Sequence, residues 1–182
     1  MTYYGGKELA AAFRTVRSNT VKAAEEIPED KYSFRAAEGS RSVAELLAHI
    51  AYGNSFQKEV VLKGPSDLKS FDFMAFMGKV AAETNKPRSK AELIAILKSD
   101  GEHYATSLEA LSEDFLQQVV TYSEGAIPPS RTRFDMLLSG KEHEMHHRGQ
   151  LMLIQRIIGM TPHLTRANEE RMAAMKAQAA KK

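Results

Sequence analysis

The sequence predicts an all-α protein, in which helices pack into a single bundle. Apolar residues recur at spacings of three and four along most of the 182 residues, and no stretch shows a clear sheet-forming pattern. A hydrophobic content of 43% in a chain of this length suffices for one well-buried domain and is short for two. We therefore expect a four-helix bundle, a fold that builds metal and cofactor sites from side chains on facing helices.

The boundaries of the first two helices are marked by local signals. Alanine-rich helical periodicity predicts a helix over 7–27, which ends before a proline. The segment 28–41 is predicted to be an ordered connection. Ser42 and Glu45 then form a capping box, which predicts a second helix that continues to about Leu62.

A second capping box, Ser89 with Glu92, predicts the third helix, which ends near Ser112. Before it, the aromatic- and methionine-rich stretch 66–87 is expected to hold a short helix over one end of the fold. After it, residues 113–130 are expected to form an extended loop, because a glycine and two prolines interrupt them.

Helical periodicity returns over 131–158 and predicts the fourth helix, which glycine and proline stop signals close. We expect residues 1–164 to form the bundle. Residues 165–182 are alanine-rich and net basic, and we expect them to be a helical extension without a domain of its own.

Composition excludes several classes of function. The net charge is only +2, and basic and acidic residues are spread along the chain, so we expect no nucleic-acid partner. The absence of cysteine excludes disulfides, thiolate ligands and a cysteine nucleophile, so any metal site must use nitrogen and oxygen ligands. The sequence has no basic segment leading into an apolar run and no apolar run of roughly 20 residues. We expect a cytoplasmic protein with no membrane partner.

The stretch "HEMHHRGQ", residues 143–150, holds three of the six histidines. On a helix His143 and His147 lie about 40° apart, whereas His146 lies about 100° from His147. The first two belong to an apolar or small stripe, which predicts that they face inward and can share one ion. His146 lies on a mixed face and is expected to have a supporting or structural role. The stripe is Met136, Gly140, His143, His147, Leu151, Ile154 and Ile158.

A metal such as zinc needs at least three protein ligands, so a third must come from another helix. His49 is the best candidate, because it is the polar member of the otherwise apolar stripe Leu46, His49, Gly53, Phe56 and Val60. His103 and His163 are expected to have surface or structural roles. Three neutral imidazoles suit zinc, nickel, copper or iron and leave coordination positions for water or substrate.

The pattern H-E-x-x-H also matches zinc proteases, in which Glu144 would be the general base. The surrounding sequence does not continue that motif, since Gln150 and Leu153 occupy the positions where metzincins have glycine and histidine. A distant third ligand, Glu169 or Glu170, stays open, but no strand is predicted that could hold an extended peptide. The protease interpretation therefore ranks behind a bundle with three histidine ligands.

Two segments of the chain, "KYSFRAAEGSRSVAELLAHIA" and "HEMHHRGQLMLIQRIIGMTP", resemble the DinB family of small four-helix metalloproteins. The resemblance extends from the first helix through Pro162, and its most specific parts are the histidine in "LLAHIA" and the block H-x-x-H-H-R-G-Q-L. It implies an up-down-down-up bundle with long connecting loops. It also implies metal ligands at His49, His143 and His147, which agrees with the two stripes.

The resemblance implies less about the reaction. Some relatives are S-transferases that use thiols such as mycothiol or bacillithiol, and some are maleylpyruvate isomerases. We expect a zinc or nickel enzyme of the thiol-dependent S-transferase or hydrolase type, acting on a small molecule, with a low-molecular-weight thiol as one candidate cosubstrate. The alternative is a non-catalytic, stress-related metal-binding bundle. We also expect a homodimer, and a cleft lined by residues 66–76 and 123–131; no catalytic side chain is assigned.

Overall fold

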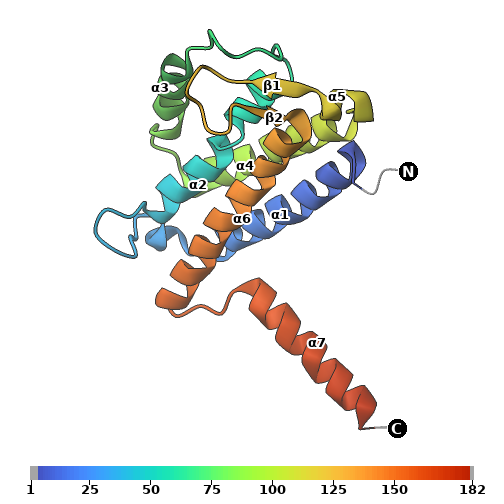
Figure 1. Cartoon of the computed structure of the whole chain (residues 1–182). Coiled ribbons are helices and arrows are strands. Elements are labelled where there is room, and N and C mark those ends of the chain that lie inside the picture. The colour runs from blue at the N-terminus through green and yellow to red at the C-terminus, as the bar shows by residue number, and fades with distance from the viewer. Residues whose placement is uncertain (1–3, 181–182) are drawn as a thin grey trace.

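The computed structural model describes residues 4–180, and they form an up-down-down-up four-helix bundle (Figure 1). α1 and α6 run in one direction and α2 and α4 in the other. Each of α1 and α2 packs against both α4 and α6, so the order around the bundle is α1, α4, α2, α6. The all-α prediction is confirmed. The four helices are α1 (Gly6–Glu26), α2 (Val43–Tyr52), α4 (Lys90–Glu109) and α6 (Arg133–Ile157).

The core forms because each long helix carries one apolar face. On α1, Leu9, Phe13 and Val16 are buried at the spacings that predicted the helix. The ring of Phe13 meets Tyr104 of α4 edge to face, with ring centroids 4.9 Å apart. Burying a side chain the size of phenylalanine contributes about 1.5–3 kcal/mol, so this contact is a main attachment of α1 to α4.

Both predicted capping boxes are present. The Ser42 hydroxyl accepts a hydrogen bond from the backbone N–H of Glu45, and the Glu45 carboxylate accepts one from the backbone N–H of Ser42. The same reciprocal pair joins Ser89 and Glu92 at the start of α4. Glu45 also forms an ion pair with Arg35, which fastens the loop before α2 to that helix. This loop begins with a short 3-10 helix, Glu29–Lys31.

The predicted second helix is not continuous to Leu62. α2 ends at Tyr52, a turn follows at Gly53 and Asn54, and the chain then forms a π-helix, Gln57–Val61. Glycine and asparagine are weak helix formers. Gly53 also leaves space for a side chain from α6, because a Cβ atom there would lie 2.6 Å from Cε1 of His143. The irregularity therefore lies where α2 meets the histidines of α6.

The segment between the third and fourth helices is more ordered than predicted. Ser112 caps a short helix, α5 (Glu113–Gln117), which the prediction of an extended loop missed. The strand β1 (Val119–Thr121) then pairs antiparallel with β2 (Ser130–Thr132), with Val120 opposite Arg131. The pairing is local: the β-branched residues of β1 meet the returning chain just before α6.

Two further helices complete the described chain. α3 (Phe73–Thr84), the short helix expected in the 66–87 stretch, is capped by Asp72 and lies beside α2 at one end of the bundle. α7 (His163–Ala179) projects from the other end, and His163 is its one buried residue (Figure 1). The division of the chain after residue 164 stays a prediction. Within 4–180, no helix is both long and apolar enough to cross a membrane.

Candidate metal centre

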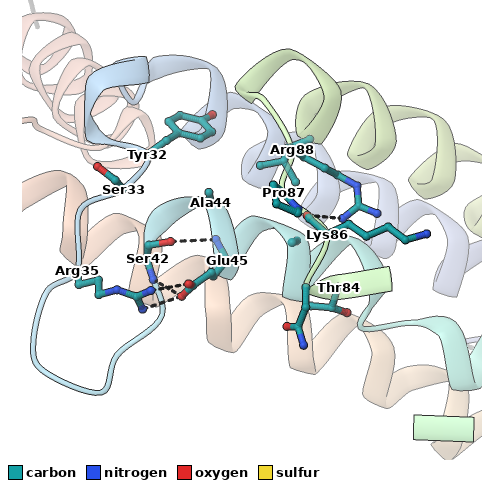
Figure 2. Close-up of a pocket in the computed structure, with 13 residues that line it drawn as sticks. Tyr32, Ser33, Arg35, Ser42, Ala44, Glu45, Thr84, Lys86, Pro87 and Arg88 are labelled. Atoms are coloured by element: carbon teal, nitrogen blue, oxygen red, sulfur yellow. Dashed lines mark hydrogen bonds and ion pairs between the residues drawn. The ribbon is translucent and has the colours of Figure 1, made fainter. Parts of the chain in front are cut away.

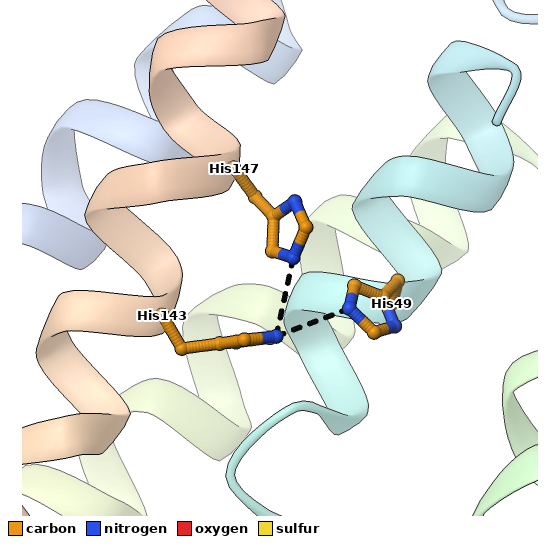
Figure 3. A group of neighbouring side chains, drawn as sticks. All are labelled: His49, His143 and His147. Atoms are coloured by element: carbon orange, nitrogen blue, oxygen red, sulfur yellow. Dashed lines mark hydrogen bonds between the residues drawn. The ribbon is translucent and has the colours of Figure 1, made fainter. Parts of the chain in front are cut away.

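Three imidazoles converge where α2 faces α6 (Figure 3). Nε2 of His143 lies 3.0 Å from Nε2 of His49 and 3.2 Å from Nε2 of His147. One ring nitrogen of each histidine can be chosen so that all three lie within 4.8 Å of one another. The structure thus brings together the three residues that the helical stripes indicated, and it leaves His103 exposed on α4.

These separations fit ligands that share one divalent ion. With metal–nitrogen bonds of about 2.0–2.1 Å, neighbouring ligand atoms lie roughly 3.0 Å apart in octahedral and roughly 3.4 Å apart in tetrahedral geometry. Gly53 supplies the space that His143 needs, since a side chain at that position would collide with the ring. The donor set and the space around it are therefore suited to a divalent metal that imidazole binds well.

Gln150 orients one of the three rings. Its Oε1 lies 2.8 Å from Nδ1 of His147, so that Nδ1–H donates and Nε2 keeps the lone pair that a metal requires. The amide nitrogen of Gln150 lies 3.3 Å from Nε2 of His146. His146 is exposed, and besides this amide contact its ring meets that of His147 edge to face, with ring centroids 4.9 Å apart. The supporting contact of Gln150 was not predicted, although its position three residues after His147 was a usable signal.

Burial keeps the three imidazoles neutral. The pKa of His49 is lowered to about 4, mainly by loss of hydration and to a smaller extent by the positive charge of Arg41 and by the neighbouring rings. Burial likewise lowers the pKa of His143 to about 4. The pKa of His147 is also lowered by burial, with the hydrogen bond to Gln150 opposing the shift. Near neutral pH each ring thus keeps one nitrogen unprotonated and able to bind a metal.

A cleft of about 330 Å³ lies beside the cluster and includes His49 and His143 in its wall. Apolar and aromatic side chains from α2, the segment after it and α3 form most of the rest, and no described carboxylate lines it. The predicted lining was largely wrong: the 66–76 stretch contributes only Phe76, and 123–131 contributes nothing. The cleft is lined by Arg41, His49, Tyr52, Gly53, Ser55, Phe56, Phe76, Met77, Val80, Ala81, Thr84, Asn85 and His143.

A larger hollow of about 630 Å³ lies between Tyr32, the start of α2 and the segment 84–88 (Figure 2). The ion pair between Arg35 and Glu45 occupies one side of it. No histidine lines it, so this hollow offers no metal ligand of the kind found between α2 and α6. We therefore place the candidate chemistry in the smaller cleft.

Glu144, the glutamate of the H-E-x-x-H pattern, points into the core and is 1% exposed. Its two carboxylate oxygens accept hydrogen bonds from Nε of Arg17 at 2.9 and 3.0 Å. Nη1 of Arg17 donates to the carbonyl of Leu97 on α4. A carboxylate bound in this way inside the bundle does not face the histidine cluster, so it is not placed to serve as a general base. The protease interpretation is therefore not supported.

Comparison with known proteins agrees with this architecture. The sequence pattern of the DinB superfamily matches residues 12–151. This chain belongs to the DinB superfamily. The match confirms the resemblance noted from the two histidine-containing segments, and it spans α2 and the part of α6 that carries His143 and His147.

Two proteins from Bacillus subtilis are similar to this chain. The uncharacterised protein YjoA is 27% identical over 154 residues, which cover 85% of this chain and 91% of YjoA. The crystal structure of YjoA, described as DinB-like, superimposes with a TM-score of 0.63 at 25% identity, covering 85% of this chain and 94% of that one. YfiT superimposes with a TM-score of 0.65 at 14% identity, over 88% of this chain and 91% of YfiT, and shows that the fold is shared.

The position of Glu144 predicts that its substitution affects stability and spares the metal site. Glu144→Gln leaves the buried Arg17 charge without its counter-ion, so we expect the free energy of unfolding to fall by about 3 kcal/mol. Urea unfolding measures this, with the exposed Glu142→Gln on the same helix as the matched control, expected to change by less than about 0.5 kcal/mol.

The double variant Arg17→Met with Glu144→Leu should recover most of the lost stability, because it removes both buried charges. Metal content per folded molecule should be unchanged in Glu144→Gln, whose amide oxygen can still accept a hydrogen bond from Arg17, and in Glu142→Gln. Unchanged stability in Glu144→Gln together with loss of peptide cleavage would restore the protease interpretation.

The lowered histidine pKa values predict how metal binding depends on pH. The folded-state pKa of His49 and His143 is about 4, below the 6.5 of an unburied imidazole, so the neutral form persists in mildly acidic solution. Metal affinity should therefore change little above about pH 6.5 and fall as the pH approaches 4, with more than one proton taken up per metal released. Equilibrium dialysis with metal analysis checks this; uptake of a single proton would argue against three imidazole ligands.

Proposed function

We propose that this protein is a divalent-metal enzyme that acts on a small molecule, with His49, His143 and His147 as the protein ligands. The observation that carries the proposal is the convergence of three neutral imidazoles beside a cleft. Among residues 4–180 no carboxylate and no fourth histidine joins the cluster, so an ion held there keeps coordination positions for water or substrate. An open position distinguishes a catalytic site from an enclosed structural one.

A divalent ion at this position supplies Lewis-acid activation of water or of a low-molecular-weight thiol. The residues of this chain orient the imidazole ligands. Gln150 fixes the tautomer of His147, and Gly53 admits the ring of His143. Phe56 and Phe76 cover one side of the cleft and limit the access of bulk water to its interior.

Hydrolysis and thiol-dependent transfer both use such an open position, and zinc and nickel both suit three imidazoles. The description of YfiT as a probable metal-dependent hydrolase supports the hydrolytic reaction. Because the sequence identity to YfiT is only 14%, the similarity shows a shared fold. The proposal of hydrolysis therefore depends on the histidine site found in this chain. The cleft beside the cluster favours an enzyme over a metal-binding protein without activity.

Metal analysis of single-histidine variants tests the ligand assignment. We expect alanine at His49, His143 or His147 to lower zinc or nickel affinity at least tenfold, because two imidazoles remain on a site that already depends on solvent. His146→Ala and His103→Ala are the matched controls and should bind metal nearly as wild type does. Retention of metal in His143→Ala with loss in His146→Ala would contradict the assignment.

Activity is tested with the same proteins after chelator treatment and reloading. A panel of small esters and amides tests hydrolysis, and small thiols with an aryl halide test transfer. The proposal predicts turnover that disappears on metal removal, returns on reloading, and is absent in the His143→Ala variant. Full turnover by the stripped protein would contradict it.

A further inference from the structure

Arg41 is the arginine in the wall of the cleft beside the histidine cluster. Its side chain is exposed and lines the cleft together with His49 and His143. No hydrogen bond or ion pair joins it to any residue of 4–180. The two arginines of the neighbouring larger hollow do form such contacts. Arg35 pairs with Glu45 (Figure 2), and Arg88 binds Tyr52 and Glu83.

Arg41 also lines a second hollow, of about 490 Å³, on its other side. That hollow reaches Gln150, the residue that orients His147. None of the described residues that line the cleft or this second hollow is an aspartate or glutamate. The walls of both cavities therefore lack a carboxylate, and Glu45, whose charge interacts with Arg41 through space, forms its ion pair with Arg35.

The charge of Arg41 acts on the histidine cluster. It contributes to the lowered pKa of His49, His143 and His147, so the guanidinium lies near enough for its field to reach all three rings. A divalent ion would add two more positive charges to the same cleft. A cleft of this charge attracts anions and disfavours cationic ligands.

The other residues that line the cleft indicate the size and polarity of a ligand that fits it. Phe56, Phe76 and Val80 give the cleft an apolar side, and its volume of about 330 Å³ is at the small end of the range for ligand pockets. A ligand that fits has a short apolar body. Such a ligand can meet two different polar groups in this wall, the imidazoles of the histidine cluster and the planar, five-donor guanidinium of Arg41.

We infer that the substrates of this enzyme are small anions, in which a carboxylate pairs with Arg41 while the reacting group lies at the three histidines. The inference rests on the proposed function, because it assigns the substrate class of the same site. An arginine binds a carboxylate through two parallel N–H···O bonds, which fixes the orientation of the substrate as well as its affinity. Arg41 is thus a specificity-determining residue and makes no contact with the reacting atoms.

The test uses cobalt-loaded protein, whose visible spectrum reports coordination of a thiol. The probes are mercaptopropionate and mercaptohexanoate, each compared with its uncharged amide, so that the two members of a pair share the metal-binding group and the length. We expect the acid of at least one pair to bind about tenfold more tightly than its amide, which corresponds to about 1.4 kcal/mol. In Arg41→Gln this preference should disappear while the cobalt content stays that of wild type.

Arg171→Gln, an exposed arginine on α7 away from both hollows, is the matched control and should keep the preference. The inference is overturned if acid and amide bind equally to cobalt-loaded wild type, or if the preference survives in Arg41→Gln. Failure of the proposed function gives a different result, because the wild-type protein then takes up no metal at the histidines. In that case the substrate assignment is also wrong. Metal analysis before each titration separates the two results.

Discussion

The buried ion pair between Arg17 and Glu144 fixes the rotation of α6, and the position of the histidine cluster depends on that rotation. Successive helical residues are about 100° apart, so holding Glu144 against α1 and α4 directs His143 and His147 toward α2. The pair is costly to desolvate and is weak evidence for net stability. Its effect is to make any other rotation of α6 unfavourable, because rotation would leave two charges unpaired in the core.

The helices around this pair make room for it and for the site. Gly101 of α4 lies against Arg17, where a Cβ atom would come within 2.7 Å of its Cγ. Gly53 lies against His143 in the same way, because a Cβ atom there would come within 2.6 Å of Cε1 of that ring. Both glycines lie where a side chain from another helix comes close. Glycine is a weak helix former, but the absence of its side chain leaves the space that Arg17 and His143 occupy.

The features that depend on local patterns could be predicted from the sequence. The four long helices, the two capping boxes and the inward stripe of α6 follow from spacing and from cap residues, and His49 stood out as the polar residue on an apolar face. The three histidines do come together, while metal binding itself stays a prediction. Gln150 was within reach of the same reasoning, because it lies one turn beyond His147 on the same helix.

Features that depend on contacts between residues far apart in the sequence could not be predicted from local patterns. Arg17 and Glu144 are 127 residues apart, and nothing local shows that either is buried. The face of α3 that lines the cleft is set by packing against α2, so the predicted lining was displaced toward the start of that helix. The single turn of α5 was missed because its serine cap precedes only five helical residues, too few to show periodicity.

Anomalous diffraction from crystals of the zinc-loaded protein, recorded at the zinc absorption edge, tests the central claim most directly. The account predicts one strong peak about 2.0–2.1 Å from Nε2 of His49, His143 and His147, with the Glu144 carboxylate still on Arg17. A peak coordinated by Glu144 or His146, or no peak among the three imidazoles, would contradict it.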